Sequence, residues 1–152
     1  MIYTVRYCHL EHASKLKIGD RLKYGDHIGR MGNTGQSTGA HLHLDGVKGS
    51  PKWLFKMHDI EIGILEPIPL RQLNYFIDKD LFKYDYEITT FYGDPRYQSK
   101  FKKVHYGIDI IPKDGNPEYF DIYWNRTKEG NVIFKGHDHK SYGHFIYIGF
   151  SI

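Results

Sequence analysis

The stretch from Gly29 to His43 constrains the fold of this chain more than any other, because a glycine-rich turn runs directly into a His-x-His pair. Side chains two residues apart project from the same face of an extended strand. We therefore expect His41 and His43 to stand side by side, with Leu42 and Leu44 turned toward a core on the opposite face. This pattern predicts a half-buried β-strand that carries two imidazoles on its polar face.

Two imidazoles on one strand face suit metal chemistry, since one can bind the ion while the other handles protons beside it. The alternative is a pair of surface histidines on a half-buried strand. The glycine-rich lead-in and two further motifs favour the metal site.

The second motif is a histidine and an aspartate four residues apart. His105 and Asp109 share one face of a predicted strand, with Ile108 and Ile110 turned to the core. Two histidines, one carboxylate and an open water position form a standard catalytic zinc set. Alone, this pair also fits a surface histidine followed by an aspartate in a turn.

The third motif, Tyr7-Cys8-His9-Leu10, supplies one more strand-borne histidine. Cys8 alternates with His9, so we expect it to face the other way and to be a core residue rather than a ligand. It is the only cysteine in the sequence, which excludes an internal disulfide framework.

Strand signals dominate the rest of the sequence and predict an antiparallel β domain with little helix. Runs of β-branched and aromatic residues bounded by Gly, Pro, Asn or Asp are typical of strands. They fall at residues 2–10, 42–47, 87–92, 107–111, 131–135 and 145–150. A weak helical period appears only around residues 70–82. Residues 49–86 contain prolines and mixed charge but no glycine-dense turns, so we expect them to be a connector.

The length of 152 residues fits a single domain with its own core. The formal net charge of +3 suits an anionic partner such as a bacterial wall, but it does not support nucleic-acid binding. No apolar run approaches the roughly 18 residues of a membrane span. The first residues lack the charged and apolar regions of a secretory signal. We therefore expect that the chain either leaves the cell by another route or is a piece of a longer polypeptide.

Together these motifs resemble the M23 family of zinc metallopeptidases, the lysostaphin or LytM type that cuts peptidoglycan cross-bridges. Its Gly-x-x-Gly-x-Ser-Thr-Gly-Pro/Ala-His-Leu-His signature is matched from Gly32 to His43. Its His-x-Gly-x-Asp motif is matched from His105 to Asp109, and its Tyr-x-His-Leu motif from Tyr7 to Leu10. The resemblance implies a mainly β, antiparallel LytM-like domain of the duplicated hybrid motif type.

The resemblance also implies the role of each site residue. Zn2+ would be bound by His43, His105 and Asp109, with water in the fourth position. His41 would act as general base on that water, and His9 would orient it or stabilise the oxyanion. Which of His41 and His43 binds the metal rests on the resemblance alone.

The order of the motifs departs from the family, in which His-x-x-x-Asp comes first. Placing the end of this sequence before its start restores the family order, so the chain resembles a circular permutant. Residues 1–48 would be the C-terminal half of the family fold, 87–152 the N-terminal half and 49–86 the connector. We therefore expect residues 145–150 to pair antiparallel with residues 2–9.

The leading functional hypothesis is a zinc endopeptidase that cuts the peptides of bacterial peptidoglycan, acting extracellularly or at the cell wall. A phage lysis or tail-associated protein would fit the missing signal. The alternative is a LytM-like wall-binding or structural phage-tail module without turnover. We expect a monomer or part of a larger wall-active protein, with a peptidoglycan peptide as partner.

Residues near Tyr92 to Tyr97 form a predicted loop that could line a peptide groove. The other histidines are interpreted as solvated: His12, His27, His58, His137, His139 and His144.

Overall fold

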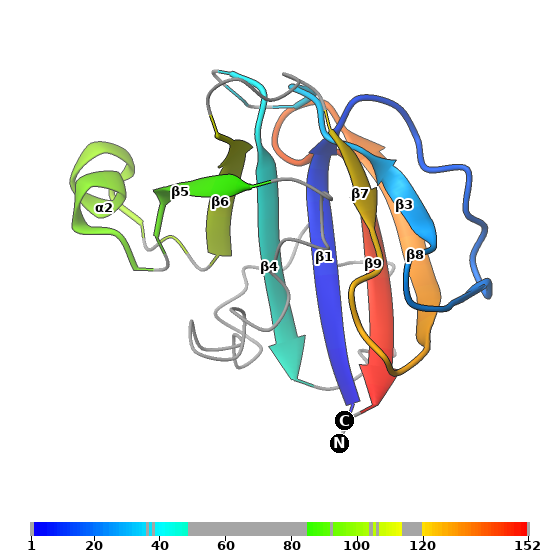
Figure 1. Ribbon diagram of the computed structural model, residues 1–152. Helices are drawn as coiled ribbons and strands as arrows, with labels where there is room; N and C mark the ends of the chain where they lie inside the picture. Colours follow the sequence, from blue (N-terminus) through cyan, green and yellow to red (C-terminus); the bar gives the residue numbers. More distant parts are fainter. Residues whose placement is uncertain are drawn as a thin grey trace.

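The chain forms an antiparallel β domain, with one short helix among the residues that the structure describes (Figure 1). This computed structural model describes residues 2–35, 37, 39–48, 85–91, 93–103, 105, 107–113 and 120–151. The expected mainly β fold is confirmed. The expected connector and its helical period at residues 70–82 lie outside the described residues, apart from residues 85 and 86.

The main sheet has seven strands in the order β2-β8-β9-β1-β4-β6-β5, and every neighbouring pair is antiparallel. Its strands are β1 (Ile2–Leu10), β2 (Arg21–Leu22), β4 (Leu42–Lys48), β5 (Tyr86–Thr90), β6 (Gly107–Pro112), β8 (Gly130–Asp138) and β9 (Gly143–Ser151). A second sheet pairs β3 (His27–Arg30) with β7 (Asp121–Tyr123). The helix α2 spans Pro95–Phe101.

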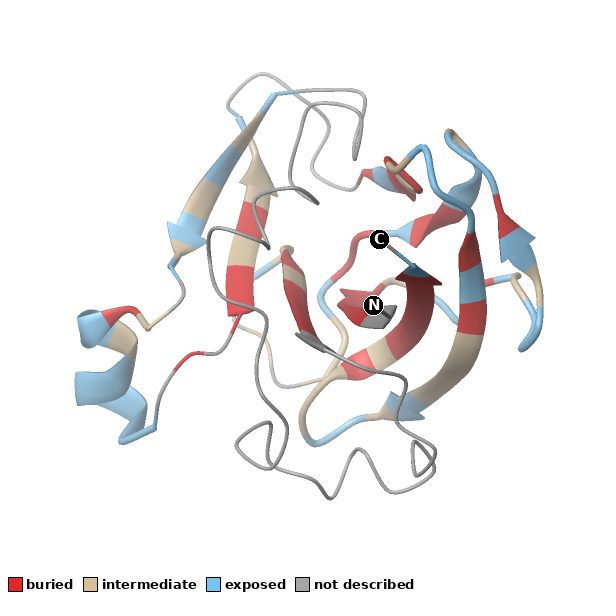
Figure 2. Cartoon of the chain, turned by 90° about the horizontal axis from the view of Figure 1, so that it is seen from below, coloured by how far each residue is buried: buried red, intermediate tan, exposed pale blue. Residues whose placement is uncertain are grey.

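The core contains apolar side chains from the central strands of the main sheet together with Ile28 of β3 and Ile122 of β7. The predicted core residues Leu42, Leu44, Ile108 and Ile110 are fully buried, as period-2 alternation requires. Figure 2 shows buried residues along the strands, whereas α2 contributes none to the core. Each such Leu or Ile side chain stabilises the fold by about 1.5–3 kcal/mol relative to an exposed one. No helix in this described part of the chain is long and apolar enough to cross a membrane.

Strands β9 and β1 pair antiparallel, with Ile2 opposite Ser151 and Tyr7 opposite Ile146. The expected pairing of residues 145–150 with residues 2–9 is therefore confirmed. Figure 1 shows the two chain ends side by side at the foot of this pair. Strand β1 lies between β9 and β4, so it pairs with a strand from the end of the sequence on one side and with a strand from its first third on the other.

The region before β6 differs from the expected loop. Residues 95–101 form α2, which begins where the carboxylate of Asp94 accepts a hydrogen bond from the Arg96 backbone N–H and Pro95 occupies the first turn. It ends at Lys102, whose backbone is left-handed with φ of 58°. The helix buries no residue, so an apolar periodicity could not have indicated it.

Candidate metal centre

The structure brings together five side chains that the sequence singled out. His9 comes from β1, and His41 and His43 lie immediately before and within β4. His105 lies just before β6, and Asp109 lies within it. All five line one open pocket of about 580 Å³. Segments distant in the sequence thus converge on a single site.

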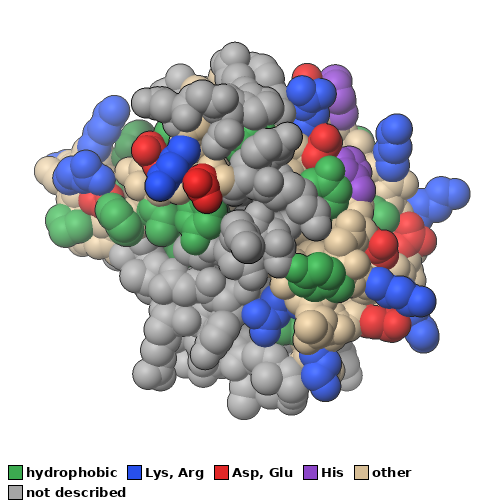
Figure 3. Space-filling model, viewed as in Figure 1, with side chains coloured by type: hydrophobic (Ala, Val, Ile, Leu, Met, Phe, Trp, Pro, Cys, Tyr) green, Lys and Arg blue, Asp and Glu red, His purple; other side chains and the backbone are tan. Residues whose placement is uncertain are grey.

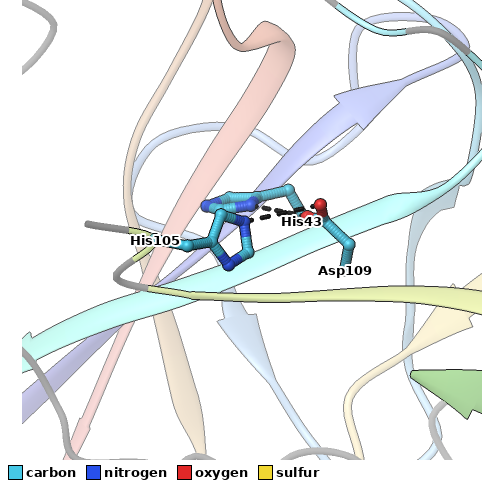
Figure 4. A group of neighbouring side chains, drawn as sticks. All are labelled: His43, His105 and Asp109. Atoms are coloured by element: carbon cyan, nitrogen blue, oxygen red, sulfur yellow. Dashed lines mark hydrogen bonds and ion pairs between the residues drawn. The ribbon is translucent and has the colours of Figure 1, made fainter. Parts of the chain in front are cut away.

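His43, His105 and Asp109 form the group that fits a metal ion. One ligand atom from each lies within 4.8 Å of the others. His43 Nδ1 lies 2.8 Å from Asp109 Oδ1, and His105 Nε2 lies 3.4 Å from Asp109 Oδ2 (Figure 4). The sheet register sets this contact, because His43 and Asp109 are direct partners in the β4–β6 pair. Two imidazoles and one carboxylate are a donor set that a divalent transition metal binds.

Backbone carbonyls orient three of the histidines. The Nδ1–H group of His105 donates to Phe91 O at 3.1 Å. That of His9 donates to Thr34 O at 2.6 Å, and that of His41 donates to Gly39 O at 2.8 Å. A carbonyl oxygen only accepts, so the hydrogen of each ring sits on Nδ1 and Nε2 keeps its lone pair.

The Nε2 atoms are left to face the site. Those of His41 and His105 lie 3.7 Å and 3.4 Å from the carboxylate of Asp109. The ring of His9 lies 4.7 Å from that of His41, between ring centroids.

In the ring of His43 the two nitrogens exchange these roles. Its Nε2–H donates to Asp45 Oδ2 at 2.9 Å, which leaves Nδ1 facing Asp109. Asp45 is in turn paired with Arg6, whose Nε–H donates to Asp45 Oδ1 at 2.7 Å. Arg6 and Asp45 are each only 2% exposed, and the guanidinium lies 3.9 Å above the ring of Tyr142. A buried ion pair thus fixes the ring of a candidate ligand.

The sequence reasoning did not identify Asp45 or Arg6. Asp45 lies two residues after His43, and that spacing on one strand face was the available signal. Arg6 had no comparable local signal, because it meets Asp45 only through the β1–β4 register.

The charges of the site follow from burial and hydrogen bonding. Burial lowers the pKa of the His43 imidazole, but hydrogen bonds with Asp109 and Asp45 outweigh it and raise the pKa to about 9. Burial raises the pKa of Asp109, yet its contacts with His105 and His43 hold the pKa well below its usual range. Burial lowers the pKa of His9 to about 4, so this ring is neutral at pH 7. The metal-free centre therefore places a charged imidazole between two carboxylates.

A β-bulge directs His9 into the site. The β1–β9 register shifts between Tyr7 and Leu10, and His9 has a left-handed backbone with φ of 64°. Strict alternation would place His9 on the core face with Tyr7, whereas the bulge re-aims its side chain. Cys8 is fully buried in a small cluster with Phe145 and Tyr147, which confirms that it is a core residue. It lies opposite His43 in the β1–β4 register and so shares the face of the site, and the expectation that it faces away from His9 is wrong.

Gly107 allows His43 to occupy its position. A Cβ at residue 107 would lie 2.7 Å from His43 Cε1 and 2.7 Å from the backbone oxygen of Leu44. Both distances are far below normal carbon contacts, so the middle residue of the His-x-Gly-x-Asp motif must lack a side chain. The motif therefore encodes the packing of the site as well as its candidate ligands.

The other predicted positions lie elsewhere. Among the described histidines interpreted as solvated, none lines the pocket: His12, His27, His137, His139 and His144. His58 lies outside the described residues. Of the residues expected near a peptide groove, Tyr97 does line the pocket, whereas Asp94 and Arg96 pair with each other at the start of α2.

The fold and site thus define an antiparallel β domain with a candidate metal centre. In comparisons with known proteins, residues 2–52 match peptidase family M23. An uncharacterized metalloprotease of Buchnera aphidicola subsp. Baizongia pistaciae is 38% identical over 79 residues, which cover 52% of this chain and 18% of that protein. Residues 2–52 are therefore similar to peptidase family M23.

Two further relatives come from Vibrio cholerae serotype O1. The peptidoglycan DD-endopeptidase ShyA is 36% identical over 78 residues, covering 51% of this chain and 17% of ShyA. The peptidoglycan DD-endopeptidase ShyC is 39% identical over 54 residues, covering 33% of this chain and 12% of ShyC. The chain therefore spans less than a fifth of each of these three relatives. No solved structure gives a significant match.

Proposed function

We propose that this chain is a zinc-dependent endopeptidase that hydrolyses peptide bonds of bacterial peptidoglycan, acting at the cell wall. The observation that carries the proposal is the convergence of His43, His105 and Asp109 with two further histidines in one open pocket. The names of the Vibrio relatives support the substrate class.

The candidate ligand set supports zinc as the metal. Two imidazole nitrogens and one carboxylate oxygen, with a fourth position open to the pocket, are typical of catalytic zinc. When bound there, zinc supplies Lewis-acid chemistry for peptide hydrolysis. The hydrogen bonds at His105 Nδ1 and His43 Nε2 hold both rings with their other nitrogen toward Asp109.

The remaining two histidines are assigned different proton roles. His41 has its Nε2 lone pair directed at the site, so it would act as the general base that removes a proton from the attacking water. His9 also carries its hydrogen on Nδ1, and burial keeps the ring neutral at pH 7. Of the two roles expected for His9, this tautomer favours orienting water by accepting a hydrogen bond at Nε2.

Turbidity of purified peptidoglycan sacculi tests the proposed activity. We expect the zinc-loaded chain to clear sacculi and the chelated chain to lose this ability until zinc is restored. Zinc binding without clearing would instead support the alternative of a wall-binding or structural module. The expected phage association stays a prediction from the sequence.

We further propose that the motif order is a circular permutation of the family order. The antiparallel β1–β9 pair, with Ile2 opposite Ser151, supports this arrangement. Joining the two ends with a two-to-four-residue turn and reopening the chain within residues 49–86 should give an active enzyme. A relinked chain that folds but binds no metal would contradict the permutation.

A further inference from the structure

The pocket is also lined by residues outside the strands that carry the metal centre. Four residues of α2 and the turn after it form a part of this lining, here called the α2 wall: Tyr97, Lys100, Phe101 and Lys103. The ring of Tyr97 lies 4.5 Å from that of His105, between centroids. The backbone N–H of Gly93 also donates to the His105 carbonyl oxygen at 2.7 Å. The wall is therefore attached to a candidate ligand and faces the reacting centre.

The helical spacing of this wall explains which side chains face the pocket. Tyr97, Lys100 and Phe101 stand at positions i, i+3 and i+4, which share one face of a helix. Because Tyr97 contacts His105, the same face presents Lys100 and Phe101 to the pocket. Phe101 is 43% exposed, and its ring lies 4.6 Å from that of Tyr97. An aromatic pair, with Phe101 exposed and Tyr97 half-buried, thus lines the pocket together with Lys100 and Lys103.

The α2 wall gives its side of the pocket a positive charge. Neither Lys100 nor Lys103 forms an ion pair with any carboxylate in the described ranges, whereas the nearby Arg96 is neutralised by Asp94. The acidic residue that lines the pocket is Asp109, which already contacts His43 and His105. Figure 3 shows Lys and Arg side chains on the lobe at the left, where α2 lies, together with hydrophobic and some acidic ones. A pocket lined in this way attracts anions.

We propose that the α2 wall binds a free carboxylate of the peptide substrate, so that the pocket favours acidic peptidoglycan stem peptides over neutral bridges such as oligoglycine. This inference rests on the proposed function and names the substrate feature that the same site selects. Lys100 and Lys103 pair with the carboxylate, and the rings of Tyr97 and Phe101 pack against the apolar part of the same residue. Lysine is suited to this role because its ammonium is a mobile point charge that adapts to substrate position.

Two matched substrates test the inference. One is a cross-linked stem-peptide dimer with free carboxylates, and the other is the same dimer with those carboxylates converted to primary amides. Exposed charge pairs are individually weak, so two lysines should give the free-carboxylate dimer an advantage of about three- to tenfold in kcat/KM. Raising the salt concentration should reduce this advantage.

The double variant Lys100→Gln/Lys103→Gln should lose the preference through a higher KM for the free-carboxylate dimer, with kcat unchanged. The control Lys17→Gln/Lys23→Gln removes two exposed lysines that do not line the pocket, and it should keep the preference. Equal hydrolysis of both dimers by the wild-type chain, or an unchanged preference in the double variant, would overturn the inference.

Calorimetric binding of the same two dimers tests the preference without turnover. The wild-type chain should bind the free-carboxylate dimer more tightly and the double variant should bind both equally. Equal binding by the wild-type chain would refute the α2 wall as a carboxylate site. Tight, carboxylate-selective binding without hydrolysis would instead contradict the proposed endopeptidase function.

Discussion

Removing the Asp45 carboxylate should destabilise this protein more than most single substitutions. The Asp45→Ala variant leaves the guanidinium of Arg6 buried without its ion-pair partner, and both side chains are 2% exposed in the wild-type chain. It also removes the acceptor of the His43 Nε2–H group. Breaking a buried pair from one side costs about 3–5 kcal/mol. That loss is a large fraction of a typical unfolding free energy of roughly 5–15 kcal/mol.

Urea unfolding of the metal-free chain, followed by circular dichroism, measures this cost. A double replacement, Arg6→Met/Asp45→Leu, removes both charges and should cost clearly less than Asp45→Ala, because no uncompensated charge stays buried. Since Arg6 and His43 hold the pKa of Asp45 well below its usual range against burial, this stabilisation is present above about pH 4 and fades in acid. A cost below about 1 kcal/mol for Asp45→Ala, or an equal cost for the double variant, would refute this reasoning.

Three further predictions concern the pocket. His41→Ala should keep the metal yet lower turnover about a hundredfold, as measured by zinc content and sacculus clearing; equal loss of zinc would show that the roles of His41 and His43 are exchanged. Burial lowers the pKa of His9 to about 4, below its unfolded value near 6.5, so the metal-free chain should lose about 3 kcal/mol of stability as the pH falls through that window. A His9→Gln variant should lose less in thermal melts over the same window. Gly107→Ala should displace the His43 ring and weaken zinc binding in chelator competition, whereas an unchanged affinity would show that the ring has room to move.

The sequence predicted the parts of the fold that depend on alternation. Strand β1 matches its predicted bounds, and the inward direction of Leu42 and Leu44 followed from a period of two. Strands β2, β3 and β7 were missed because they have two to four residues and are defined by their pairing partners rather than by their own pattern.

The candidate site was predictable to the extent that its motifs are local. His41, His43, His105 and Asp109 lie on regular strand positions or next to them, so spacing alone gave their faces. The direction of His9 was not predictable in this way, because it depends on a bulge with a left-handed backbone.

The supporting residues required long-range information. The contact between Arg6 and Asp45 arises from the register of β1 on β4. Helix α2 depends on the cap at Asp94 and on packing of Tyr97 against His105, and it has no buried apolar face that a pattern could reveal.

Metal content measured together with sacculus clearing tests the central claim most directly. The purified full chain should hold about one zinc ion and clear sacculi, and chelation should abolish the clearing until zinc is added back. His105→Ala should lose both the zinc and the activity while its far-ultraviolet spectrum keeps the β signature. Full zinc occupancy in His105→Ala, or clearing that survives complete metal removal, would contradict the assignment of His43, His105 and Asp109 as the catalytic zinc site.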